Sequence, residues 1–203
     1  MHLFNRIALT AAASVFALAA HAAAKVGEAA PNFTLPANEG KTHSLADYKG
    51  KTVVLEWTNA ECPFVKKHYS GGNMQSLQKA YTGKDVVWLS INSSAPGKQG
   101  AVDAAGATAI VKEKSAAPTL VMLDAKGEVG RLYEAKTTPH MYVIDKTGKL
   151  VYAGGIDSEP SADPADIATA TPYVKNALDE VLAGKAVTTA VTKPYGCSVK
   201  YAG

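Results

Sequence analysis

The stretch from Thr52 to His68 constrains the fold of this 203-residue sequence more than any other part. It begins with a short apolar run, Thr52 to Trp57, that is rich in β-branched residues, as is typical of a strand buried on both faces. A turn follows, and Pro63 directly after Cys62 suits the first position of a helix. The sequence therefore predicts an α/β architecture with Cys62 between a central strand and a helix.

The position of Cys62 at a helix start is expected to lower the pKa of its thiol. A helix N-terminus presents free N–H groups and about half a positive charge, which favours a thiolate. Cysteines at such positions beside basic groups have pKa values of about 3.5 to 7.5 instead of about 8.5. Lys66 lies one turn further on, and we expect its ammonium to reach back over Cys62. Cys62 is therefore predicted to be reactive, the simpler alternative being a structural cysteine.

The segment from Trp57 to Val65 resembles the active-site segment of thioredoxin-like redoxins, with Cys62 at the position of the attacking cysteine. Where that family commonly has its second cysteine, this sequence has Val65. Thr138-Pro139 ahead of a predicted strand resembles the cis-proline segment of the same family. The resemblance implies an α/β fold, a thioredoxin-like three-layer α/β/α sandwich with a mixed central sheet.

The tail carries the only other cysteine. The run from Gly196 to Tyr201 resembles the Gly-Cys-Ser-x-Lys-aromatic end of a peroxiredoxin-like branch of the redoxins, of the alkyl hydroperoxide reductase and thiol-specific antioxidant type. A resolving thiol would therefore have to be Cys197. In an oxidising compartment a static Cys62–Cys197 disulfide is the alternative, but a low-pKa thiol is a good leaving group and favours a redox-active pair.

The first residues resemble a secretory signal. Arg6 precedes an apolar stretch from Ile7 to Ala20 that is too short for a membrane span, and Ala20-His21-Ala22 offers a small-x-small cleavage site. We therefore expect a signal peptide at 1–22, a redoxin domain at 23–186 and a tail at 187–203. A soluble protein of the periplasm or another extracytoplasmic compartment follows. The net charge of +3, without a basic cluster, predicts no nucleic-acid partner.

Three further residues complete the predicted site. The resemblance implies that Thr138 and Pro139 position the substrate through a cis bond that leaves backbone groups free for pairing; an ordinary trans proline is the alternative. Glu56 is a carboxylate in an otherwise apolar strand. A carboxylate that is buried in a sheet covered on both faces must bind its proton more tightly or find a partner. By resemblance Glu56 moves protons to and from the cysteines; a structural hydrogen bond is the alternative.

Two other classes of function stay open. Peroxiredoxins use a Pro-x-x-x-Thr/Ser-x-x-Cys segment and an arginine, whereas this sequence has Leu55 and Asn59 at the corresponding places, and its only arginine after the signal is Arg131. A copper-binding thioredoxin-fold module would use cysteine with His68 or His140. We expect His68 to be a helix-surface or packing residue.

The sequence thus predicts an exported thiol–disulfide oxidoreductase without a cofactor or a metal. Cys62 is the nucleophile and Cys197 the resolving thiol, with Glu56, Thr138 and Pro139 in support. The expected partners are a protein or small-molecule disulfide or thiol, with peroxide as the alternative substrate, and an exported or membrane reductant. Strands are expected near 86–91, 119–123, 140–144 and 149–153, and helices near 63–70, 73–81, 100–116, 130–135 and 172–182, whereas the tail shows no pattern.

Overall fold

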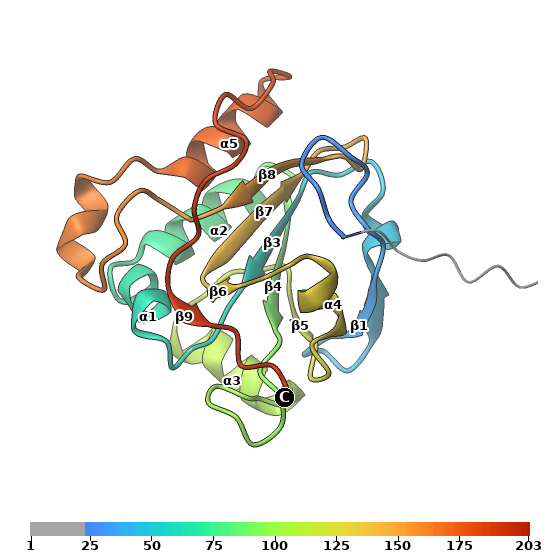
Figure 1. Ribbon diagram of the computed structural model, residues 1–203, viewed down its shortest axis with the longest axis vertical. Helices are drawn as coiled ribbons and strands as arrows, with labels where there is room; N and C mark the ends of the chain where they lie inside the picture. The colour runs from blue at the N-terminus through green and yellow to red at the C-terminus, as the bar shows by residue number, and fades with distance from the viewer. Residues whose placement is uncertain (1–22) are drawn as a thin grey trace, which may run out of the picture.

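A five-stranded mixed sheet forms the centre of the computed structural model, which describes residues 23–203 (Figure 1). The signal peptide predicted at 1–22 lies outside the described residues. The strand order is β5-β4-β3-β7-β8. These strands are β3 Val53–Trp57, β4 Val87–Asn92, β5 Leu120–Leu123, β7 His140–Ile144 and β8 Leu150–Gly154.

Strand β3 lies in the middle of this sheet, as its apolar sequence predicts. Leu55 stands opposite Leu89 of the parallel strand β4 and Tyr142 of the antiparallel strand β7. β5 extends the parallel side and β8 the antiparallel side. The mixed thioredoxin-like sheet is therefore confirmed. All five residues of β3 are buried, so both faces of the sheet are covered.

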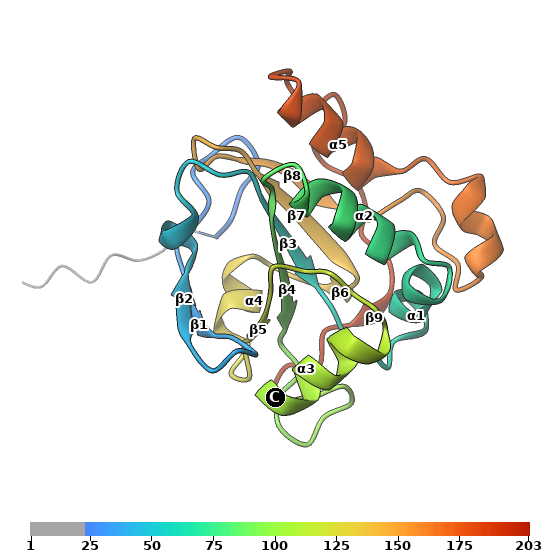
Figure 2. The ribbon, with the colours of Figure 1, turned by 180° about the vertical axis from the view of Figure 1, so that it is seen from behind.

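Most of the helices cover one face of the sheet. Figure 2 shows α2, α3 and α5 in front of it, and Val54 of β3 packs on this side against Met74 of α2 and Leu178 of α5. The other face, with Leu55 and Trp57, packs against α4 and the N-terminal segment. The helices are α1 Pro63–Ser70, α2 Asn73–Thr82, α3 Ala104–Glu113, α4 Glu128–Leu132 and α5 Tyr173–Leu182.

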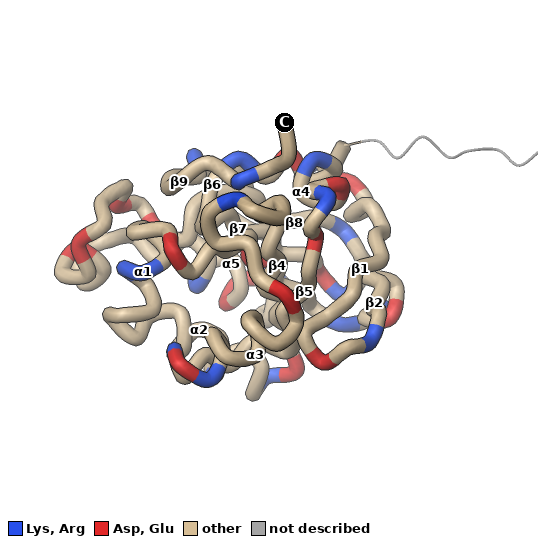
Figure 3. Tube along the Cα trace, turned by 90° about the horizontal axis from the view of Figure 1, so that it is seen from below, with Lys and Arg blue, Asp and Glu red and all other residues tan. Residues whose placement is uncertain are grey.

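Short elements complete the described chain. They are β1 Thr34–Pro36, β2 Thr42–Ser44, the 3-10 helix η1 Leu45–Tyr48, β6 Thr137–Thr138, the 3-10 helix η2 Pro164–Ala168 and β9 Cys197–Ser198. Within residues 23–203, no helix combines the length and the apolar character that a membrane span needs. Figure 3 shows basic and acidic residues interspersed on one side of the molecule.

Three helix boundaries follow from local chemistry. The predicted break after Ser70 is confirmed, because α2 begins after Gly72, whose φ of 70° favours glycine. Helix α3 is shorter than predicted. Its start is set by Asp103, whose side chain accepts a 2.7 Å hydrogen bond from Gly106 N. It ends just before Ser115, which has a φ of 50°.

The tail is the part that the sequence left without a pattern. After α5 it returns along the molecule and forms β9, which pairs antiparallel with β6 (Figure 1). Thr138 stands opposite Cys197 in this pairing. A strand of two residues is too short to show an alternating pattern, so only its partner reveals it.

Candidate active site at the start of helix α1

Cys62 occupies the N-cap position of α1, as predicted. Its backbone is extended, Pro63 follows at the first helical position, and Cys62 N donates to Asn59 O at 3.0 Å. Asn59 is itself buried and braces the turn, because its Oδ1 accepts from Glu61 N at 2.9 Å. The turn between β3 and α1 therefore holds the sulfur in a fixed place.

The Thr138-Pro139 segment lies against this sulfur. The peptide bond is cis, so that prediction is confirmed. Cys62 Sγ donates to Thr138 O at 3.1 Å. The Thr138 hydroxyl is buried without a hydrogen-bond partner among the described residues. It is therefore free to donate to Cys62 when that sulfur is a thiolate.

Strand pairing brings the second cysteine to the same place. Cys197 stands opposite Thr138 in the β6–β9 ladder, and its thiol lies close enough to shift the pKa of Cys62. Both cysteines are free thiols. The close approach requires a glycine beside it, because a Cβ on Gly196 would lie 2.1 Å from Thr138 O.

The two thiols ionise differently. Burial acts to raise the pKa of Cys62, but interactions with the Cys197 thiol, with the backbone of Val65 and Cys197 and with the Thr138 hydroxyl outweigh burial and lower it. Burial and the neighbouring Cys62 raise the pKa of Cys197 to about 11. The Val65 contribution is the predicted helix-start effect, whereas Lys66 is not among these causes. Cys62 therefore loses its proton more readily than Cys197.

The tail closes the site. Cys62 is fully buried, and Cys197 of β9 lies beside it. Cys197 is half-buried. We therefore expect reagents to reach the Cys62 sulfur more readily when β9 separates from β6.

Glu56 lies in a separate hydrogen-bond network on the helix-covered face. As expected of a buried carboxyl group, burial raises its pKa and it also has hydrogen-bond partners. Neither sulfur is among its partners. Its oxygens accept from Trp88 Nε1 at 2.8 Å, Ser90 Oγ at 2.8 Å, Tyr69 OH at 3.0 Å and Gln78 Nε2 at 3.2 Å.

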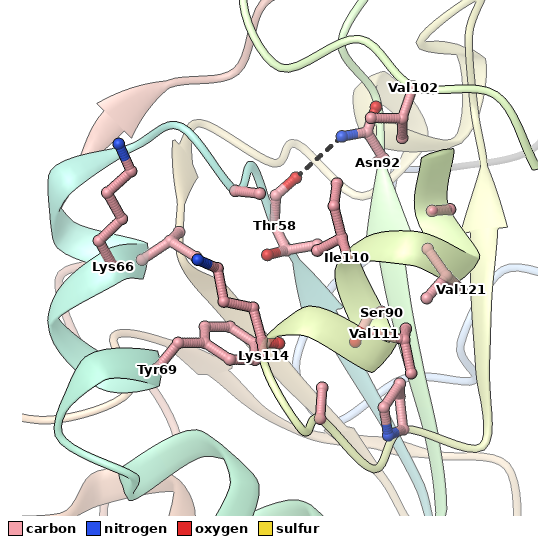
Figure 4. Close-up of a pocket in the computed structure, with 15 residues that line it drawn as sticks. Thr58, Lys66, Tyr69, Ser90, Asn92, Val102, Ile110, Val111, Lys114 and Val121 are labelled. Carbon is pink, nitrogen blue, oxygen red and sulfur yellow. Dashed lines mark hydrogen bonds between the residues drawn. The ribbon is translucent and has the colours of Figure 1, made fainter. Parts of the chain in front are cut away.

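A largely apolar pocket lies between α1 and α3, next to this network. It encloses about 570 Å³ including its open mouth. Figure 4 shows Tyr69 and Ser90, two donors to Glu56, among the lining residues, with Lys66 and Lys114 on its flanks. Asn92 Nδ2 donates across the pocket wall to Thr58 O at 3.4 Å. Glu56 is therefore separated from the pocket by the side chains that bind it.

The residues weighed for the other functions lie elsewhere. Arg131 stacks on the ring of Tyr201 at 4.7 Å and donates to Ala202 O at 2.8 Å, so it braces the end of the tail. His68 is fully buried, which makes it a packing residue and not a surface residue. His140 is also buried, beside Tyr142. Within the described part of the chain, no three His, Cys, Asp or Glu side chains cluster as metal ligands.

A glycine substitution tests whether the tail covers Cys62. In Gly196→Ala the new methyl group meets Thr138 O, so β9 should separate from β6 and the alkylation rate of Cys62 should rise about tenfold or more, as expected for a strain of 1–3 kcal/mol. Peptide mass spectrometry after timed iodoacetamide treatment measures that rate. Gly148→Ala is the matched control, because Gly148 also has a positive φ but no atom lies within 4 Å of an added Cβ. Equal rates in both variants would refute the covering role of the tail.

The chain is similar to known proteins over the region that contains Cys62. The model of a family described as the AhpC/TSA family matches residues 26–153. The thiol-disulfide oxidoreductase ResA of Geobacillus thermodenitrificans (strain NG80-2) is 29% identical over 128 residues, which cover 63% of this chain and 68% of that protein.

Solved structures are also similar to this chain. A hypothetical protein from Sinorhizobium meliloti 1021 has a TM-score of 0.73 and 25% identity over 88% of this chain and 95% of its own. The thioredoxin domain of a thiol-disulfide oxidoreductase from Bacteroides vulgatus has a TM-score of 0.51 and 19% identity over 71% of this chain and 96% of its own. This second likeness shows the thioredoxin-like fold alone.

Proposed function

Because the chain belongs to the AhpC/TSA family and is a thiol-dependent oxidoreductase, we propose that it exchanges disulfides through Cys62 as nucleophile and Cys197 as resolving thiol. One observation carries this assignment of roles. The pairing of Thr138 with Cys197 places a second thiol beside a Cys62 whose pKa is lowered, in a chain that has no other cysteine.

The proposed reaction has two steps. The Cys62 thiolate attacks one sulfur of a substrate disulfide, so that a mixed disulfide forms and the first substrate thiolate leaves. Cys197 then loses its proton and attacks the Cys62 sulfur, which forms the internal disulfide and releases the second substrate thiol. Two electrons pass from the pair to the substrate, and the same steps run in reverse when the oxidised pair meets a dithiol.

The surrounding residues have supporting roles in this proposal. The Thr138 hydroxyl, buried without a partner, donates to the Cys62 thiolate, and Pro139 holds this loop against the sulfur. Glu56 binds a proton tightly but has no contact with either cysteine among its hydrogen bonds, so any part it has in proton transfer runs through its neighbours. The tail occupies the backbone edge of β6, and it must open for a polypeptide substrate. The predicted signal at 1–22 supports an exported compartment and a reductant that reaches it.

The reduction potential of the cysteine pair tests this function. The full chain is equilibrated in thiol buffers of graded potential, alkylated and examined by mass spectrometry. A redox-active pair should have a potential above about −300 mV, because a low-pKa thiol makes its disulfide easier to reduce. Cys62→Ser is the control that cannot form the bond. A potential below about −300 mV would mean a static structural disulfide and would contradict the proposed exchange.

A further inference from the structure

A second cluster of polar side chains lies beneath the tail, just before Cys197. The Tyr195 hydroxyl lies 3.0 Å from His68 Nε2 and donates to Asp157 Oδ1. His68 is fully buried and Asp157 is only 4% exposed. Asp157 Oδ2 has no hydrogen-bond partner among the described residues, although Lys67 Nζ lies 3.9 Å away. The exchange reaction uses none of these side chains.

The hydrogen bonds of this cluster run in one direction. Asn73 Nδ2 lies 2.9 Å from His68 Nδ1, and an amide nitrogen donates, so His68 Nδ1 accepts. Burial lowers the pKa of His68 to about 4, so the ring is neutral near pH 7 and its proton lies on Nε2. Nε2 therefore donates to Tyr195, which in turn donates to Asp157. This chain fixes the position of the Tyr195 hydroxyl from both sides.

The ring of Tyr195 rests on the first two turns of α1. Phe64 packs edge-on against it at 5.9 Å, and Lys67 Nζ lies 5.5 Å from its centroid. Phe64, Lys67 and His68 have the spacing of residues on one face of a helix. The tail is thus attached to the same helix that begins at Cys62.

We propose that Tyr195 is a positioning residue that sets the separation of the two thiols by fixing the tail to α1. This inference rests on the proposed function. Helix α1 carries Cys62 at its N-cap and Tyr195 on its side, and only Gly196 lies between Tyr195 and Cys197. The tail is therefore placed relative to the nucleophile by a single rigid element.

The other end of the tail has an anchor of its own. Tyr201 OH donates to Ala135 O at 2.8 Å, and its ring fills the space that Gly127 and Gly130 leave free. Loss of the Tyr195 hydroxyl should therefore leave the tail attached through Tyr201 while Cys197 moves away from its place above Cys62. A positional effect without unfolding is the expected signature.

Tyr195→Phe tests this role, because it keeps the ring and removes only the hydroxyl. The equilibrium constant for forming the Cys62–Cys197 disulfide from glutathione disulfide should fall about tenfold or more, since small displacements of reacting groups have effects of this size. The thiolate absorbance of Cys62 should also titrate at higher pH than in the parent, because Cys197 helps to lower the pKa of Cys62. Tyr48→Phe is the matched control, since Tyr48 OH lies 3.2 Å from His43 Nδ1 at a remote site.

The outcomes separate this inference from the proposed function. A Tyr195→Phe variant within twofold of the parent in both measurements overturns the positioning role. If the parent protein forms no internal disulfide at any ratio of glutathione to glutathione disulfide, the exchange function is contradicted. The titration of Cys62 in the parent and in Tyr195→Phe then tests the positioning role by itself. Asn73→Ala removes the first donor of the chain at a half-buried position. Asn73→Ala should lower the equilibrium constant for the internal disulfide and raise the pH at which Cys62 titrates, both by less than Tyr195→Phe does. If thermal unfolding shows that Tyr195→Phe is misfolded, Asn73→Ala takes its place in the test.

Discussion

The variant Cys197→Ser, treated with glutathione disulfide, is expected to stop at a mixed disulfide on Cys62. Cys62 keeps its place at the start of α1, so the first exchange should still occur. Serine cannot displace the bound glutathione, because an alcohol does not resolve a disulfide. Intact-mass spectrometry should therefore show one glutathionyl adduct per chain, and peptide mapping should locate it at Cys62.

The parent and a second variant frame this result. The parent should pass through the adduct and end as the internal disulfide without added mass beyond the loss of two hydrogens. Cys62→Ser should form neither the internal bond nor an adduct at residue 62. If Cys197→Ser turns over a dithiol substrate at the parent's rate, the resolving role of Cys197 is wrong.

Replacement of Glu56 by leucine is expected to destabilise the fold by about 3 kcal/mol or more. Four side-chain donors converge on this carboxyl group, and leucine would leave them without an acceptor in the interior. Each buried donor that loses its partner costs about 1–3 kcal/mol. Urea unfolding at pH 7 measures the change. Glu113→Leu is the control, because its carboxylate is exposed, and an equal loss in both variants would refute the structural role of Glu56.

Glu56→Gln separates the charge of this residue from its hydrogen bonds. Burial raises the pKa of Glu56. At pH values between the unfolded and the folded pKa, the folded chain therefore keeps a proton on Glu56 that the unfolded chain has released. The stability linked to this proton is complete below the unfolded pKa of about 4.3 and is lost as pH rises through the folded value. Glutamine does not titrate at this position. The unfolding free energy of the parent minus that of the variant should therefore fall as pH rises above about 4.3, and a difference independent of pH would contradict the raised pKa.

Much of the fold could be predicted from local sequence. The apolar run of β3, the Cys62-Pro63 helix start and the break after Ser70 each depend on residues close together in the chain, and all three are confirmed. The buried carboxyl of Glu56 was also predictable, because strand alternation alone places it on a covered face. Its four donors come from β4, α1 and α2, so no local pattern announces them.

The predicted site was incomplete for the same reason. Cys197 could be named as the only other thiol, but its place opposite Thr138 depends on a two-residue ladder between distant segments. His68 was expected at the surface or in packing, and its contact with Tyr195 follows only from the path of the tail over α1. Neither contact is indicated by a helical or strand pattern in the sequence.

The sequence by itself determined that Cys62 begins a helix after a buried strand, because strand, turn and helix start are set by neighbours along the chain. Only the tertiary structure decided that Cys197 of the tail lies beside this sulfur and that Tyr195 of the tail packs on α1. Those contacts depend on backbone pairing and side-chain packing between segments far apart in the sequence, and the spacing of residues along one segment carries no information about them.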